Sequence, residues 1–313
     1  MNGVENSQDD GGVTIAVLTY RRPDDLAAIL PMLVDQARRA SSPTRILVID
    51  NDPAGGARGY VETLTDQPIR YVHEPTPGIA AARNRAIDES TGAELMIFID
   101  DDERPVDGWL QALLDTSTKT GADGVVGPVA SRFTGTLDPW IEAGGFFTRR
   151  RLETGAEVQV AATNNLLLNV RSVQSRGLRF DQQLGLIGGE DTLFTRQLTG
   201  TGGRIVWCAE ALVHDIVPAD RMTRNWVLRR AFRMGGSASR VEVRLAGSFG
   251  ARTRARIGQL LLGGSRLAAG LLRFGLGVLT LSPGKRAAGA RNLARGLGLV
   301  TGVFGLEYRE YQR

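Results

Sequence analysis

The chain has 313 residues, 42% of them hydrophobic, so it is long enough for one large domain with an appendage or for two domains. This composition excludes disorder throughout, and the lone cysteine, Cys208, excludes a disulfide framework and a cysteine-based zinc site. The net charge of +4 is unevenly divided: residues 221–313 hold 18 Lys and Arg against 3 Asp and Glu, and residues 1–220 hold 20 against 31.

The chain begins with a polar, acidic stretch, MNGVENSQDDGG, which lacks the basic start and apolar run of a secretory signal. We expect residues 1–12 to be a flexible N-terminus and the protein to be cytoplasmic. We also expect a body over residues 13–220 and a basic, mostly helical region over residues 221–313.

Four short apolar runs rich in β-branched residues predict strands in the first hundred residues. They are 13–19 (VTIAVLT), 45–50 (RILVID), 69–74 (IRYVHE) and 95–100 (LMIFID), and helix-like stretches at 24–40, 59–65, 79–90 and 108–120 separate them. Strands without polar alternation that are spaced by helices indicate an α/β fold with a mostly parallel sheet covered on both faces. Such a sheet binds ligands outside the carboxyl ends of its strands.

The fourth predicted strand runs directly into four acids, Asp100 to Glu103. Carboxylates this close repel one another and resist leaving water, so the cluster is costly unless a cation is held there. Alternate residues of an extended segment point the same way, so Asp100 and Asp102 can converge on Mg²⁺ or Mn²⁺. A helix cap or a solvated acidic turn is the plain structural alternative.

Other polar groups are predicted to lie near the same edge of the sheet. Arg22 follows the first strand, and Arg83 lies in a helix that begins behind a glycine, so both can favour a diphosphate. No glycine-rich dinucleotide or P-loop motif follows the first strand, which argues against a dinucleotide oxidoreductase and a P-loop NTPase. Surface ion pairs are the alternative role for these arginines.

Beyond residue 123 the chain contains further predicted strands at 124–133, 158–170 and 204–208, and a glycine-rich loop that leads into a helix over 185–203. That helix begins with Glu190 and Asp191, which are favourable helix-start residues or, together with the first acidic cluster, a proton acceptor facing a metal-bound phosphate. His214 is one of two histidines, and a lone histidine is by default structural.

The basic tail contains two Leu- and Gly-rich stretches, 257–281 and 287–306. Arg266 and Arg273 interrupt the first, and an arginine in mid-bilayer is costly, so a spanning helix is disfavoured. Helices that are apolar on one side and cationic on the other suit an anionic membrane surface, and packing on the body is the alternative. We expect no nucleic-acid partner, because aromatic residues are sparse here and no nucleic-acid motif is present.

The motifs VTIAVLTYRRP, VIDND, GIAAARNRAID, MIFIDDDE and GGEDTLFTRQL, in this order and spacing, resemble glycosyltransferase family 2 on the GT-A fold over about residues 13–235. The resemblance implies an inverting enzyme that uses a nucleotide-diphospho-sugar, commonly a UDP-sugar, and a divalent metal, Mn²⁺ or Mg²⁺. The processive signature Q-x-x-R-W is absent, since residues 225–236 read NWVLRRAFRMGG. We therefore expect transfer of a single sugar.

The resemblance also implies roles for individual residues. Asp191 matches the catalytic base, with Glu190 beside it, and Asp102 matches the metal ligand, with Asp100 and His214 as further ligands. The expected donor-binding residues are Thr19, Arg22, Asp50, Arg83, Asp100 and Asp101. The expected acceptor-binding residues are Asn164, Asn165 and Trp140.

This reading predicts transfer of a sugar to a hydroxyl of a saccharide or of a lipid-linked acceptor, in polysaccharide or glycoconjugate synthesis at the cytoplasmic face of a membrane. Two alternatives from other classes are a sugar-nucleotide nucleotidyltransferase and a membrane-associated module that binds nucleotide-sugars without turnover. The first usually has a glycine-rich N-terminal loop with a basic residue, which TYRRP at 19–23 lacks.

Overall fold

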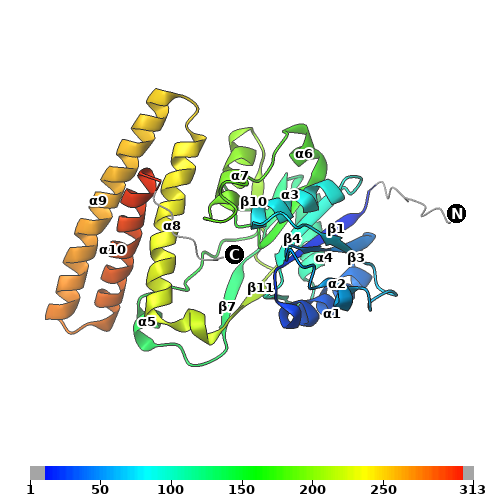
Figure 1. Ribbon diagram of the computed structural model, residues 1–313, viewed down its shortest axis with the longest axis horizontal. Helices are drawn as coiled ribbons and strands as arrows, with labels where there is room; N and C mark the ends of the chain where they lie inside the picture. The colour runs from blue at the N-terminus through cyan, green and yellow to red at the C-terminus, as the bar shows by residue number, and fades with distance from the viewer. Residues whose placement is uncertain (1–10, 306–313) are drawn as a thin grey trace. The chain divides into compact units, whose positions relative to one another are not determined.

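The structure is a computed structural model that describes residues 11–305 (Figure 1). It divides into two compact units, each discontinuous in sequence. The first comprises the chain up to Ala130 with Arg151–Gln182 and Phe194–His214, and the second comprises Ser131–Arg150, Gln183–Leu193 and the chain from Asp215 onward. The predicted division into 13–220 and 221–313 remains a prediction, and most of the predicted flexible N-terminus, 1–12, lies outside the described residues.

An eight-stranded sheet forms the centre of the first unit, in the order β3-β2-β1-β4-β9-β6-β10-β8. Its strands are β1 Val13–Thr19, β2 Thr44–Asp50, β3 Ile69–His73, β4 Leu95–Asp100, β6 Gly124–Val126, β8 Glu157–Val158, β9 Asn165–Asn169 and β10 Ile205–Trp207. Strand β1 pairs in parallel with β2 and β4, whereas β9 runs antiparallel between β4 and β6. The predicted α/β fold with a mostly parallel sheet is confirmed.

Helices cover both faces of this sheet: α1 Pro23–Arg39, α2 Arg58–Val61, α3 Ile79–Glu89, α4 Trp109–Thr120 and α6 Val170–Ser175, with α7 Glu190–Gly200 contributing its second half. Alternate residues of β1 enter two separate hydrophobic cores. Ile15 and Val17 pack with residues of α1 and α4, while Ala16 and Leu18 pack with residues of α3, α6 and α7. Every residue of β1 is therefore buried, which explains its unbroken apolar sequence.

Local signals in the sequence set the bounds of α1. Pro23 occupies its first turn with Asp24 and Asp25, and Arg38 and Arg39 lie in its last turn, where their charges favour the helix dipole. The buried residues recur at helical spacing: Leu26, Ile29, Leu30, Leu33 and Val34. Helix α1 therefore begins immediately after Arg22 and keeps this arginine at the end of β1.

A second, three-stranded sheet has the order β5-β11-β7, with β5 Glu103–Pro105, β11 Val213–Val217 and β7 Val129–Phe133. The boundary between the two units passes through β7 and β11. The second unit also contains the short helices α5 Pro139–Ala143 and η1 Ala219–Met222.

Three long helices, α8 Arg224–Leu245, α9 Phe249–Leu279 and α10 Pro283–Val303, form most of the second unit and lie side by side (Figure 1). Thr223, Ser248 and Ser282 cap their N-termini by accepting hydrogen bonds from backbone N–H groups. Among residues 11–305, α9 is the one helix with the length and hydropathy of a membrane span, and 17% of its most apolar window is buried. Such a helix is, on its own, only a weak indication of a membrane protein.

Candidate active site

The carboxyl ends of β1, β2 and β4 lie together at one edge of the large sheet. The strand register pairs Thr19 with Asp50 and Leu18 with Asp100, so the last residues of all three strands are neighbours. The four acids that follow Ile99 are therefore delivered to this edge, where parallel sheets bind ligands.

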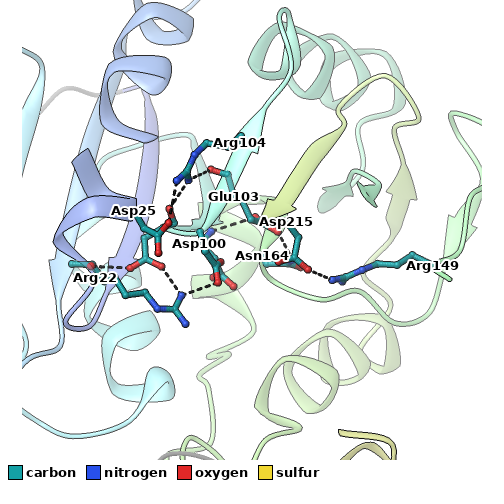
Figure 2. Close-up of polar contacts among 11 residues, drawn as sticks. Arg22, Asp25, Asp100, Glu103, Arg104, Arg149, Asn164 and Asp215 are labelled. Carbon is teal, nitrogen blue, oxygen red and sulfur yellow. Dashed lines mark hydrogen bonds and ion pairs between the residues drawn. The ribbon is translucent and has the colours of Figure 1, made fainter. Parts of the chain in front are cut away.

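Arg22 joins two of these acids (Figure 2). Its Nη1 donates to Asp101 Oδ1 at 2.9 Å and to Asp102 Oδ2 at 2.8 Å, and the hydroxyl of Thr19 donates to Asp101 Oδ2 at 2.8 Å. Asp101 is only 3% exposed. Burial raises the pKa of Asp101 to about 6 despite the opposing charge of Arg22 and its hydrogen bonds. The Asp101 side chain thus holds Thr19 and Arg22 in place, and its contact with a donor remains a prediction.

The pKa of Asp100 is raised further than that of Asp101. Burial, reinforced by the charges of Asp102 and Asp101, raises its pKa to about 7, although Arg83 and Arg22 act in the opposite direction. Three acids compete here for the charge of two arginines. A bound cation would relieve this crowding and favour the ionised form of each carboxyl.

The carboxylate oxygens of this cluster fit a metal site that substrate phosphate completes, and not a site made of protein ligands alone. Within the described part of the chain, no group of three His, Cys, Asp or Glu side chains is placed to hold a metal ion. A site completed by protein ligands alone is therefore not preformed. Carboxylate oxygens from one or two acids, with substrate phosphate filling the remaining positions, are the usual ligands of Mg²⁺, and Asp100 and Asp102 match that pattern.

The nucleotide-pocket candidates Asp50 and Arg83 are both buried, at 1% and 5% exposure. The carboxylate of Asp50 accepts hydrogen bonds from the backbone N–H groups of Asp52 and Ala57 and from the hydroxyl of Tyr71. These bonds fix the turn after β2, so recognition of a nucleobase by Asp50 remains a prediction. The guanidinium of Arg83 lies 5.4 Å from the centre of the Phe180 ring, and its charge lowers the pKa of Asp100.

The two asparagines predicted to contact the acceptor have different environments. Asn164 Nδ2 donates to Glu103 Oε1 at 2.5 Å, which ties the loop before β9 to the acidic cluster (Figure 2). Asn165 is fully buried: Oδ1 accepts from Trp109 Nε1, and Nδ2 donates to the carbonyls of Pro128 and Ala211. The prediction for Asn165 therefore needs correction, because a side chain with every polar atom used inside the fold cannot reach an acceptor.

The predicted base and its neighbour belong to the second unit. Glu190 and Asp191 form the first turn of α7, and the Asp191 carboxylate accepts hydrogen bonds from the N–H and hydroxyl groups of Thr192. Glu190 is 6% exposed. His214 is the last residue of the first unit, in β11. That Asp191 faces Asp102 in one site remains a prediction, because the two residues belong to different units.

Trp140, the third predicted acceptor contact, lies in an aromatic cluster of the second unit. Its ring stacks on Phe146 at 5.4 Å between centroids, and the guanidinium of Arg224 lies 5.1 Å from its centre. Arg224 also pairs with Asp138, which caps α5. The indole is partly exposed, so the acceptor role of Trp140 remains a prediction.

Sequence reasoning did not single out a polar group around Asp215. Asp215 accepts from Arg149 (Figure 2), and the guanidinium of Arg230 lies beside the stacked rings of Phe147 and Trp226. Burial lowers the pKa of Arg230 to about 10, with the charge of Arg149 adding to the effect and that of Asp215 opposing it. In the sequence, the signal that could have revealed this group is an acid directly after His214, in a region rich in arginine.

Comparison with known proteins identifies the class to which this fold and this acidic edge belong. The sequence profile of Glycosyl transferase family 2 matches residues 14–177. The chain belongs to this family, and it is a glycosyltransferase.

The chain is 38% identical over 232 residues to succinoglycan biosynthesis protein ExoM of Rhizobium meliloti, covering 73% of this chain and 74% of ExoM. Glycosyltransferase AglE of Haloferax volcanii is 26% identical over 229 residues, 71% of each chain.

Among solved structures, S. aureus TarS 1-349 in complex with UDP-GlcNAc has a TM-score of 0.52 at 15% identity, with 90% of this chain and 89% of that chain covered. GalNAc-T7 with UDP, GalNAc and Mn²⁺ has a TM-score of 0.53 at 13% identity, with 74% and 47% covered. At this identity the structural likeness supports the fold, which is of the GT-A type.

Proposed function

We propose that this glycosyltransferase moves one sugar from a UDP-sugar to a hydroxyl of a saccharide or lipid-linked acceptor, with inversion at the anomeric carbon, in the synthesis of a polysaccharide or glycoconjugate. The observation that carries the proposal is the arrangement of Asp100, Asp101 and Asp102 with Arg22 at the carboxyl edge of the sheet. The names of the relatives support the rest: ExoM is a protein of succinoglycan biosynthesis, and two of the similar structures hold UDP-GlcNAc or UDP with Mn²⁺.

Asp102 and Asp100 would hold the divalent ion, Mn²⁺ or Mg²⁺, with His214 as a further candidate ligand. When bound, such an ion neutralises charge that develops on the departing diphosphate. Arg22, which pairs with Asp102, would offer its guanidinium to a phosphate oxygen of the donor. Its planar guanidinium suits either partner. Arg83, buried beside Asp100, supplies a second fixed positive charge.

The reaction itself needs one proton acceptor. The acceptor oxygen bonds to the anomeric carbon, the bond from that carbon to the diphosphate breaks, and the electron pair leaves with the diphosphate. Asp191 takes the proton of the attacking hydroxyl. An ordinary aspartate is a weak base, so proton transfer occurs late, when the hydroxyl has become acidic by bonding to a carbon with oxocarbenium character.

The second unit supports a location at the cytoplasmic face of a membrane. Large apolar residues of α9 are exposed, and the segment from residue 221 carries a large excess of positive charge. This combination favours attachment to an anionic bilayer surface, where a lipid-linked acceptor would be available.

Replacement of Asp191 by Asn tests the assignment of the base. We expect Asp191→Asn to lower kcat for transfer by about 10²- to 10⁴-fold, because general-base catalysis supplies acceleration of that order. Its Kd for UDP in the presence of Mn²⁺ should stay as in the wild type. Asp107→Asn, at a carboxylate that is 93% exposed, is the matched control and should leave both quantities unchanged. Full activity of Asp191→Asn would remove Asp191 from the mechanism. A panel of UDP-, GDP- and dTDP-sugars in the same assay identifies the donor.

A further inference from the structure

Helix α9 has its polar and apolar faces reversed relative to a helix of a water-soluble bundle. Its buried residues are Gly263, Gly270 and Gly277, spaced seven apart on the face toward α10. Most of its large apolar residues are exposed: Ile257, Leu261, Leu262, Leu271, Leu272, Leu276, Val278 and Leu279, with exposures from 42% to 82%. Water is an unfavourable solvent for such a face.

Glycines bring α9 and α10 close together. A Cβ on Gly270 would lie 2.9 Å from the backbone nitrogen of Leu293, and one on Gly289 would lie 2.6 Å from that of Phe274. Small residues in a repeating pattern permit this close approach, as they do between helices in lipid. The α9–α10 contact therefore depends on backbone proximity and buries few large apolar side chains.

Arginines occupy the same seam. Arg266 and Arg273 each follow a seam glycine by three residues, which places them on the α10-facing side of α9. Arg291 and Arg295 of α10 lie close enough to Arg266 that its charge lowers the pKa of both, in addition to the larger effect of burial. We call these four residues the arginine seam.

Within residues 11–305, no acidic side chain pairs with the arginine seam. Residues 249–303 contain no Asp or Glu, and none of the four arginines forms an ion pair with a carboxylate anywhere in residues 11–305. The Nε of Arg266 is buried without a hydrogen-bond partner, and Arg291 Nη1 donates to the carbonyl of Gly145. Arg266, Arg291 and Arg295 are half-buried and Arg273 is exposed beside them. Clustered guanidinium groups of this kind without an anion are unfavourable, so the cluster favours the binding of an anion.

We propose that the arginine seam binds the phosphate of an anionic phospholipid while the exposed face of α9 lies against the acyl chains of the same bilayer. The proposal rests on the membrane location proposed above and names the lipid group that is recognised. A phospholipid matches both features at once, because guanidinium groups bind phosphate and the adjoining surface is apolar. An acidic peptide would satisfy the charge and leave the apolar face of α9 in water.

Flotation of the full chain with vesicles tests the proposal, using phosphatidylcholine alone and phosphatidylcholine with phosphatidylglycerol. We expect the wild type to float with the anionic vesicles. The variant Arg266→Gln/Arg273→Gln should lower the partition coefficient roughly tenfold or more. The control Arg254→Gln/Lys285→Gln removes the same charge from exposed positions of α9 and α10 that do not belong to the arginine seam, and it should lower the coefficient clearly less. Equal losses in both variants would mean diffuse charge attraction and would overturn the arginine seam as a site.

A second variant tests the apolar half of the proposal. Leu271→Ser/Leu272→Ser replaces side chains that are 65% and 67% exposed, so the fold should tolerate it. We expect it to lose flotation although its charge is unchanged, and retained flotation would overturn the contact of α9 with acyl chains. Binding of UDP with Mn²⁺, measured on every variant, separates the outcomes. Failure of the arginine seam leaves this binding intact, and failure of the wild type to float refutes the membrane location. Absence of UDP binding refutes the proposal that the donor is a UDP-sugar.

Discussion

The four consecutive acids after Ile99 occupy two kinds of environment. Asp101 and Glu103 are 3% and 1% exposed and hold Arg22, Thr19 and Asn164 in place. Asp100 and Asp102 keep more exposed carboxylates, and burial together with its neighbours raises the pKa of Asp100 to about 7. One acidic run thus provides two residues that organise the edge of the sheet and two that remain accessible to a ligand.

Asn165 gives a prediction at the scale of a single residue. Asn165→Ala leaves Trp109 Nε1 and the carbonyls of Pro128 and Ala211 without their buried partner. Each buried polar group left unsatisfied costs about 1–3 kcal/mol, so we expect a large fall in the free energy of unfolding measured in urea. The exposed control Gln159→Ala should change it by less than about 0.5 kcal/mol. Unchanged stability with lost transfer would instead support the acceptor role first predicted for Asn165.

At the scale of elements, β9 shows what local pattern can and cannot predict. The apolar runs of β1, β2 and β4 predict strands because each is buried on both faces, and their bounds agree with prediction to within a residue or so. The run at 158–170 predicts one strand, whereas the structure has β8, a loop and β9, which is inserted antiparallel between β4 and β6. Strand partners are set by the whole sheet, so periodicity within one segment does not reveal them. The burial of Asn165 follows from the same insertion.

Asp123 links three elements and gives the chain a testable dependence on pH. Burial alone would raise its pKa, but hydrogen bonds from the hydroxyl of Ser172 and the N–H of Arg204, with the charge of Arg176, lower it below its ordinary value of 3.8. The unfolded chain therefore binds this proton more readily than the folded one. The stabilisation is present above about pH 4 and is lost as the pH falls through the lower, folded pKa. We expect Asp123→Asn to flatten the fall of the urea midpoint on acidification, and an unaltered pH profile would contradict this role.

Two glycines of the C-terminal helices provide a matched test of whether close helix packing requires glycine. A Cβ on Gly298 would clash with the backbone carbonyl of Phe232 in α8, whereas a Cβ on Gly275 has nothing within 4 Å. We expect Gly298→Ala to lower the thermal midpoint because α8 and α10 must separate. Gly275→Ala should raise stability by about 0.5–1 kcal/mol through its helix propensity. If both variants lowered the midpoint equally, close packing of α8 and α10 would not be what requires glycine.

At the scale of the whole molecule, the uneven distribution of charge along the sequence accompanies two different kinds of packing. The first unit is a sheet with two apolar cores, whereas α9 and α10 meet through glycines and arginines and leave large apolar residues exposed. Sequence alone predicted the fold class and the family, because strand runs and motifs are local signals. It did not predict that the compact units are discontinuous, because that depends on which loops pack with the C-terminal helices.

Metal-dependent binding of UDP, measured by calorimetry on the full chain, tests the central claim that the acids after β4 hold a cation bridging the donor. We predict that the wild type binds UDP more tightly with Mn²⁺ than without it, and that Asp102→Asn weakens the Mn²⁺-dependent binding by about tenfold or more, equivalent to about 1.4 kcal/mol. Asp107→Asn should bind as the wild type does, and the thermal midpoints of the three proteins should agree. Wild-type affinity for UDP and Mn²⁺ in a folded Asp102→Asn variant would contradict the account.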